Sequence, residues 1–271
     1  MTPSPFPSLL DAAQALADGR TTARELVEQA LERIHDVNGE GSRVFMAVHT
    51  DNARQQADII DTLRQQGRAP SITAGLPISI KDLFDEAGSV SRAGSRVLDK
   101  AAPASTDAPA IRSLKQAGMI SMGRTTMTEF AFSGVGINPH FGTPANPWHR
   151  AERRIPGGSS SGAAISVSDG MACVGIGSDT GGSCRIPAAL TGLVGFKPTA
   201  RRISTQGTVP LSYTLDSVGS LGRTVQCCWA ADSLMATGNL RLQDAPDGRN
   251  GRLLRLGILN TVVMDGMEPT V

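Results

Sequence analysis

Two short Gly-Gly-Ser units carry the residues best suited to chemistry. Residues 156–164 read P-G-G-S-S-S-G-A-A, and residues 177–187 read G-S-D-T-G-G-S-C-R-I-P. Glycine lets the backbone approach a ligand closely and adopt positive φ angles. Successive amides in such a turn form a concave group of N–H donors, and a following helix N-terminus adds positive potential. If the Ser183 hydroxyl attacks a carbonyl carbon, the amides of residues 180–183 are expected to stabilise the oxygen anion.

A serine nucleophile needs a base, and the sequence offers two kinds. No histidine stands in a recognisable arrangement with a serine; the four are His35, His49, His140 and His149. Lys81 is the alternative, because it follows an alternating apolar run at 75–80 that predicts a strand leading into the interior. Burial lowers the pKa of a lysine, and a neutral amine accepts a proton. From the residues alone, a structural lysine in a salt bridge with Asp82 or Asp85 is the commoner arrangement, so both interpretations stay open.

Helices and strands are expected to alternate along the chain and to position these motifs. The helices are predicted at 8–17, 22–36, 51–67, 107–118, 126–132, 160–169 and from 181 onward. The strands are predicted at 75–80, 119–122, 173–177 and 254–259. Ser8 and Asp107 fit N-caps, and Thr22 with Glu25 fits a capping box. The alternation predicts an α/β architecture in layers. Residues 134–158 are rich in Gly, Pro and Asn and predict a long irregular loop, a kind of segment that is often functional.

Composition excludes several classes of protein. The 271 residues are 40% hydrophobic and 19% charged, which is ample for a buried core. The formal net charge of +1 gives no basic excess for binding nucleic acid. Neither a secretion signal nor an apolar run of about 18 residues is present, so we expect a cytoplasmic protein without a membrane segment. The four cysteines form no C-x-x-C pair, so we expect reduced, buried thiols, no metal and no cofactor.

Two other motifs fit parts of the same stretch poorly. Residues 158–162 satisfy G-x-S-x-G, but the nucleophile elbow of α/β-hydrolases follows a buried strand, whereas here a polar run ending in Pro156 comes first. Residues 175–181 give G-x-G-x-x-x-G without the acidic residue about 20 positions later that a dinucleotide loop requires. Neither alternative is favoured.

The order of the motifs resembles the amidase signature family from about residue 8 to about residue 223. The resemblance is carried by G-L-P-I-S-I-K-D-L-F around Lys81, by both serine-bearing segments, and by N-P-W, G-F-K-P-T and L-D-S-V-G at 146–148, 195–199 and 215–219. It implies an α/β amidase signature fold, with a central mixed twisted sheet flanked by helices. Residues 1–271 would form a single amidase domain that holds every catalytic motif but is truncated at its C-terminal part.

The family mechanism, transferred by motif, implies a catalytic triad of three residues. Ser183 is the expected nucleophile, Lys81 the base, and Ser159 the bridging serine, preceded by a cis peptide bond at Gly158–Ser159. The two serines lie 24 residues apart, as the family places them. Four residues are expected to bind the substrate or its oxyanion: Thr180, Gly181, Gly182 and Ala131.

Three further residues are expected to support the triad. Ser160 would assist the relay by hydrogen bonding, Asp179 would fix the glycine turn through backbone amides, and Arg185 would pair with a carboxylate or carbonyl. The resemblance implies an amidase that converts a small-molecule carboxamide into a carboxylate and ammonia or an amine through an acyl-enzyme. Nucleic acid and membrane are not expected as partners, while a homodimer or partner subunits are. The alternatives are the glutaminase subunit of a tRNA-dependent amidotransferase and an inactive fragment.

Overall fold

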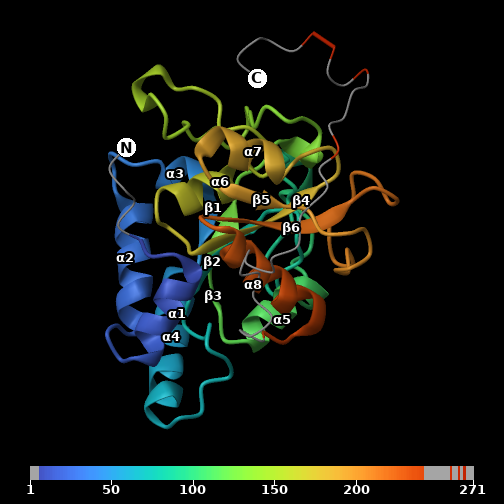
Figure 1. The fold of residues 1–271 in the computed structure, drawn as a ribbon. Helices are drawn as coiled ribbons and strands as arrows, with labels where there is room; N and C mark the ends of the chain where they lie inside the picture. Colours follow the sequence, from blue (N-terminus) through green and yellow to red (C-terminus); the bar gives the residue numbers. More distant parts are fainter. Residues whose placement is uncertain (1–5, 241–256, 258–261, 263–264, 267–271) are drawn as a thin grey trace.

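A six-stranded mixed sheet forms the centre of the molecule (Figure 1). The computed structural model describes residues 6–240 together with 257, 262, 265 and 266, so the strand expected at 254–259 lies outside the described residues except for its Gly257. The strand order is β1-β3-β2-β4-β6-β5, parallel from β3 to β4 and antiparallel for the other pairs. The strands are β1 Phe45–Val48, β2 Pro77–Lys81, β3 Ile120–Thr125, β4 Val174–Asp179, β5 Val194–Phe196 and β6 Ser217–Gly222.

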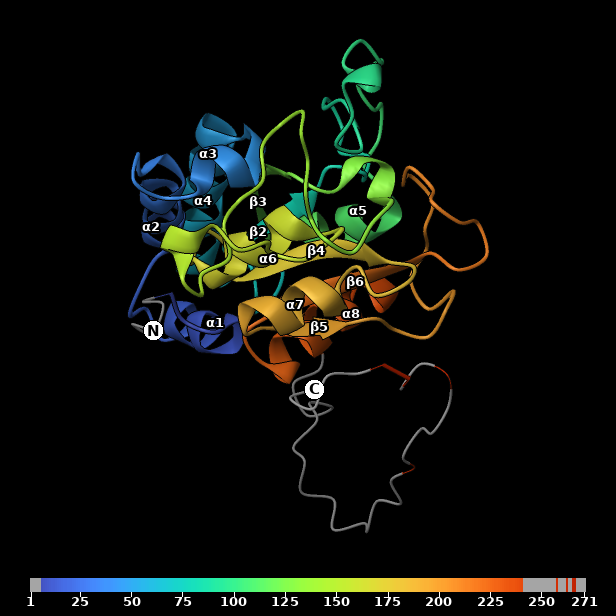
Figure 2. The same cartoon turned by 90° about the horizontal axis from the view of Figure 1, so that it is seen from above.

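The helices flank this sheet (Figure 2). They are α1 Leu9–Ala17, α2 Ala23–His35, α3 Gly41–Val44, α4 Thr50–Gln65, α5 Pro109–Gln116, α6 Ser161–Ser168, α7 Arg185–Thr191 and α8 Val225–Thr237. Short 3-10 turns occur at Arg96–Leu98, Glu129–Ala131 and Arg150–Glu152. The α/β layered fold expected from the sequence is therefore confirmed.

Capping was predicted correctly at the first two helices and wrongly at α5. Ser8 accepts a hydrogen bond from the Asp11 amide, and the capping box of Thr22 and Glu25 is formed in full. The N-cap of α5 is Ala108, without a side-chain bond. The Asp107 carboxylate instead accepts hydrogen bonds from the amide of Ala87 and the amine of Lys115. The Asp107 carboxylate therefore bonds to these two donors and not to the free amides at the start of α5.

The two faces of the sheet differ in the size of their side chains. On one face, a Cβ atom at Gly175 would lie 2.7 Å from the carbonyl oxygen of Ala163 in α6, and one at Gly177 would lie 2.7 Å from the Ser160 hydroxyl. The absence of side chains here lets α6 and its preceding turn lie directly on β4. Close contact at this face is what brings the first Gly-Gly-Ser unit onto the end of β4.

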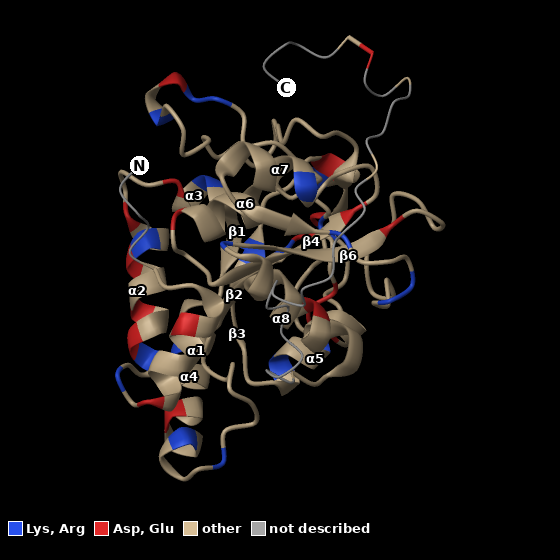
Figure 3. Cartoon of the chain, in the orientation of Figure 1, with Lys and Arg blue, Asp and Glu red and all other residues tan. Residues whose placement is uncertain are grey.

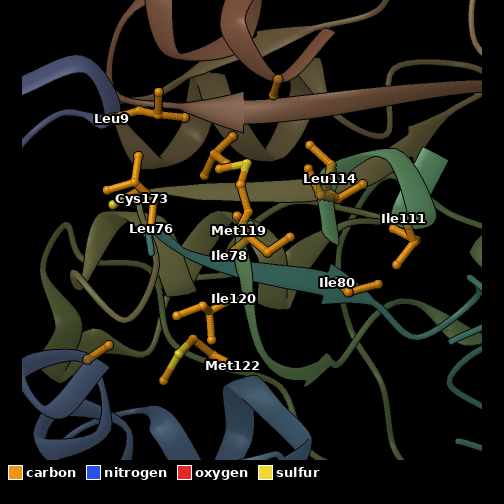
Figure 4. Close-up of a cluster of buried hydrophobic side chains, with 14 of the residues drawn as sticks. Leu9, Leu76, Ile78, Ile80, Ile111, Leu114, Met119, Ile120, Met122 and Cys173 are labelled. Carbon is orange, nitrogen blue, oxygen red and sulfur yellow. The ribbon is translucent and has the colours of Figure 1, made fainter. Parts of the chain in front are cut away.

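The other face of the central strands carries the larger apolar residues of the main core. Figure 4 shows Ile78 and Ile80 along β2, with Leu114 of α5 and Met119 nearby. These side chains are buried, and α8 packs against α5 and against β6. Burying a side chain of this kind stabilises the fold by about 1.5–3 kcal/mol, so the packing of this layer holds β2 in place.

Two boundaries near the site differ from the prediction. Strand β3 continues through Gly123 to Thr125 instead of ending at the glycine, because a Cβ there would lie 2.1 Å from the Ala47 carbonyl oxygen of β1. Glycine allows this close strand approach. Helix α7 begins at Arg185, not at 181, so the second Gly-Gly-Ser unit forms an open turn before the helix.

Charged side chains gather on the outer helices, whereas α6 carries none (Figure 3). None of the helices in the described part of the chain has the length and apolar character that a membrane crossing requires.

Candidate functional site

Lys81 is the last residue of β2, and its side chain is fully buried. Its amine lies 2.7 Å from the hydroxyl of Ser159 and 2.9 Å from the hydroxyl of Ser178. The alternative salt bridge with Asp82 or Asp85 is not found among the described residues. Asp82 pairs with Arg124, whose Nε lies 3.2 Å from the carboxylate. The amine is thus held by hydroxyl groups and not by a carboxylate.

Burial lowers the pKa of the Lys81 amine to about 8, because a buried cation loses the solvation that water provides. The charges of Asp179 and Asp216 and the thiol of Cys184 act in the opposite direction and limit the fall. A pKa of about 8 leaves a useful fraction of neutral amine near neutral pH. This is the property that a general base requires.

Ser159 lies beside this amine, and the amide of the next residue, Ser160, donates to Ser183 in the second glycine turn. The Gly158–Ser159 peptide bond is cis, as predicted from the resemblance. The carbonyl oxygen of Ser159 accepts a hydrogen bond from the Thr128 amide at 3.1 Å, and the Gly158 amide donates to Gly134. The long loop at 134–158 therefore packs against the site, and a Cβ at its Gly136 would lie 2.3 Å from the carbonyl oxygen of Gly157.

Ser183 lies in the turn between β4 and α7 and is 7% exposed. Its carbonyl oxygen accepts a hydrogen bond from the Ser160 amide at 3.2 Å, which joins the two Gly-Gly-Ser units. Asp179 fixes the turn as predicted, because its carboxylate accepts from the amides of Gly182, Cys184 and Arg185. The Arg185 side chain pairs with the same carboxylate, at 2.8 and 3.0 Å. The expected partner of Arg185 is thus Asp179.

The expected set of oxyanion donors needs one correction. The Gly182 amide points to the Asp179 carboxylate at 2.8 Å, because that carboxylate is buried and requires donors. The amides of Gly181 and Ser183 have no hydrogen-bond acceptor within the described residues. A Cβ at Gly181 would meet no atom within 4 Å, so there is open space at this part of the turn.

The remaining predicted residues lie around the same turn. The Ser160 hydroxyl donates to the carbonyl oxygen of Ser178 at 3.3 Å, so it bonds to the backbone of β4 and not to the hydroxyl of Ser159 or Ser183. The Thr180 hydroxyl donates to Asp216. Ala131, at φ 59°, lines a small cavity of about 10 Å³ together with Ser178 and Asp216. Ala131 is therefore next to the site, on the side of the 3-10 turn at Glu129–Ala131.

Two residues of the site, Ser178 and Asp216, were not singled out from the sequence. Ser178 is the fifth residue of β4, which lies beside β2 with Ile80 opposite Ile176. A hydroxyl near the end of a strand in the G-S-D-T segment is the signal that points to Ser178. Asp216 belongs to the L-D-S-V-G motif and accepts from the Leu211 and Ser212 amides, which joins their loop to Thr180.

The other titratable groups lie elsewhere. The ring nitrogens of His49, His140 and His149 lie 3.3–3.7 Å from glutamate oxygens, and that of His35 lies 3.4 Å from Thr50. All four cysteines are free and buried, as expected. In the described part of the chain, no group of three or more His, Cys, Asp or Glu residues is arranged to hold a metal ion.

Residues 25–269 match the family model described as Amidase. The chain is 41% identical over 221 residues to 2-amino-5-chloromuconic acid deaminase of Comamonas testosteroni, covering 81% of this chain and 47% of that protein. It is 38% identical to a glutamyl-tRNA(Gln) amidotransferase subunit from Chromohalobacter salexigens, covering 82% of this chain and 44% of that protein.

The fold is also similar to that of solved structures. The peptide amidase of Stenotrophomonas maltophilia superposes with a TM-score of 0.79 at 31% identity, covering 86% of this chain and 48% of that one. The chain spans about half the length of the curated relatives it matches.

Proposed function

The chain belongs to the amidase family, and from this we propose that it hydrolyses carboxamides with Ser183 as nucleophile, Ser159 as proton bridge and Lys81 as base. The observation that carries the proposal is the fully buried Lys81 amine, 2.7 Å from the Ser159 hydroxyl. A buried lysine without a carboxylate bonded to it is costly to keep charged. Its neutral form is a base, and the serine beside it is the group from which it would take a proton.

The proposed reaction has two stages. Neutral Lys81 takes a proton from Ser159 as Ser159 takes one from Ser183, and the Ser183 oxygen forms a bond to the carboxamide carbon. The relay then returns the proton to the leaving nitrogen, the C–N bond breaks, and an acyl ester remains on Ser183. Water attacks this ester with the same relay as base, releasing the carboxylate. The amides of Gly181 and Ser183 are the proposed oxyanion donors in both stages.

An apolar hollow beside Ala131 favours a substrate with an apolar acyl group. The hollow has a volume of about 680 Å³ and is lined by residues of two loops: Thr128, Glu129, Phe130, Phe132, Ile137, Pro139, Pro210 and Leu211. Apolar walls of this kind bind hydrocarbon or aromatic groups by excluding water. An anilide of a short apolar acid is therefore the first substrate to test.

A second candidate is the glutaminase subunit of an amidotransferase that works with partner subunits. The 38% identity to a glutamyl-tRNA(Gln) amidotransferase subunit favours it. Release of ammonia from glutamine only when partner subunits are added would support this candidate. Hydrolysis of the anilide by the chain alone would support the amidase.

Labelling with a fluorophosphonate tests the nucleophile and the base separately from the substrate. We expect the parent chain to form an adduct at Ser183, the Ser183→Ala variant to form none, and Lys81→Ala to react at least 100-fold more slowly. Ile80→Met changes the adjoining residue on the opposite face of β2 and is a control for damage to the end of the strand. An adduct that survives Ser183→Ala would refute the assignment of the nucleophile.

A further inference from the structure

We propose that Ser178 is a positioning residue that orients the Lys81 amine so that its lone pair faces Ser159. The inference rests on the proposed role of Lys81 as base and adds a residue to that role. The Ser178 hydroxyl lies 2.9 Å from the amine, and the Ser159 hydroxyl lies 2.7 Å from it, so each forms a separate hydrogen bond with the amine. These two hydroxyls are the hydrogen-bond partners of the amine among the described residues.

The chemistry of a neutral amine explains why a second hydroxyl is needed. A neutral amine has two N–H groups and one lone pair, and rotation about its C–N bond interchanges their directions. To accept the Ser159 proton, the lone pair must point to Ser159, so the N–H groups must point elsewhere. An acceptor at Ser178 fixes one N–H and thereby the rotation. Without that acceptor, an N–H points to Ser159 in two of three staggered positions.

The Ser178 hydroxyl is not needed to hold its own strand. The backbone of Ser178 is paired with Val218 in β6, and its carbonyl oxygen accepts from the Ser160 hydroxyl. The Ser178 hydroxyl itself bonds to Lys81, and no other partner is found among the described residues. Removing the hydroxyl therefore leaves the strand bonds in place and changes the environment of the amine.

The titratable groups near the amine come from three segments of the chain. Asp179 lies at the end of β4 and is neutralised by Arg185, Cys184 precedes α7, and Asp216 precedes β6. On β2 itself, Asp82 is engaged by Arg124. Replacing Ser178 removes none of these groups, so we expect a change in the Lys81 titration to report on the hydroxyl.

The first measurement is the titration of Lys81 itself. The chain has four lysines, Lys81, Lys100, Lys115 and Lys197, so ¹³C-labelled lysine gives few side-chain signals, and Lys81→Met identifies the one of interest. Ser178→Ala removes an acceptor that favours the charged amine, so the pKa of Lys81 should fall by about one unit. Ser178→Thr keeps the hydroxyl and should leave that pKa close to the parent value.

The second measurement is the rate of fluorophosphonate labelling from pH 5 to 10. The labelling rate should rise with pH as Lys81 loses its proton and then reach a plateau. For Ser178→Ala we expect this rise to occur at lower pH, because the pKa of Lys81 is lower, and we expect the plateau rate to fall by about 10- to 100-fold. A purely structural role of Ser178 would lower the yield of folded protein without changing the pH at which the labelling rate rises. Ser178→Thr should keep the plateau within about threefold of the parent.

Ser79→Ala is the matched control. Ser79 is buried on β2 two residues before Lys81, and its hydroxyl pairs with Ser166, which also donates to the carbonyl oxygen of Ala163. Its loss should leave both the pKa of Lys81 and the plateau rate unchanged.

The outcomes separate this inference from the proposed function. A parent chain that is not labelled at Ser183 overturns the proposed function and the role of Ser178 with it. A labelled parent whose Ser178→Ala variant keeps the parent plateau rate, or the parent pKa of Lys81, overturns the inference about Ser178 alone.

Discussion

Replacing Lys81 by methionine should change how the stability of the protein depends on pH, whatever reaction the protein catalyses. Burial lowers the pKa of Lys81 from 10.5 to about 8. Below pH 8 both the folded and the unfolded chain hold the proton, so the full cost of a buried cation is present. Between pH 8 and 10.5 the unfolded chain holds it and the folded chain does not. The free energy of unfolding of the parent therefore rises with pH in this window.

The magnitude follows from the two pKa values. Their separation corresponds to about 3 kcal/mol, of which about 2 kcal/mol is recovered between pH 7 and pH 10. Methionine has a similar length and no proton to lose. At pH 7 it relieves the cost of the charge but leaves the hydroxyls of Ser159 and Ser178 without their shared partner, at about 1–3 kcal/mol. The two effects nearly cancel at pH 7.

Urea denaturation of both chains at pH 7, 8, 9 and 10 measures the difference directly. The stability of the parent relative to Lys81→Met should increase by about 2 kcal/mol across this range. Ile80→Met controls for packing at the preceding position, since it changes no titrating group, and its difference from the parent should stay constant. A parent-minus-Lys81→Met difference that changes by less than about 0.5 kcal/mol would show that the amine titrates as it does in water.

Three other changes test the residues around the proposed triad. Asp179→Asn removes the carboxylate that fixes the turn holding Ser183, so labelling at Ser183 should fall by about 100-fold. Arg124→Met leaves the carboxylate of Asp82 buried without its cation. Urea denaturation at pH 7 should show that the free energy of unfolding falls by about 3–5 kcal/mol. The fall should be smaller at pH 5, because burial raises the pKa of Asp82 and its carboxyl is more readily protonated there. Gly136→Ala would put a Cβ 2.3 Å from the carbonyl oxygen of Gly157 at a φ of 85°, and should lower the thermal midpoint and the labelling rate together.

The parts of the fold that were predicted correctly depend on local sequence. The capping box of Thr22 and Glu25 needs residues three apart, and the alternation before Lys81 marks a strand within six residues. The prediction for Asp107 was wrong because its competing partner, the Ala87 amide, lies 20 residues away. Local patterns cannot show which of two partners such a carboxylate will choose.

The elements that were missed have no local pattern. Strand β6 reads S-V-G-S-L-G, and its two serines and two glycines have low strand propensity; it is a strand because β4 and β5 pair with it on both sides. Helix α8 is apolar around most of its circumference and so lacks a polar face to reveal its period. Ser178 was missed for a related reason, since its contact with Lys81 joins residues 97 positions apart.

Lys81 and Asp82 are neighbours in the chain but are treated differently by the fold, and this contrast bears on function. The buried carboxylate of Asp82 receives a cation from Arg124 and an amide from Gly94. The buried amine of Lys81 receives only hydroxyl oxygens. A lysine serving stability alone would be cheaper to bury with a carboxylate bonded to it, or to replace by an apolar residue. A base needs the opposite, because a bonded carboxylate raises the pKa of an amine and keeps it protonated. The hydroxyl partners of Lys81 are therefore those expected for the proposed base, and not those expected for a lysine that serves stability alone.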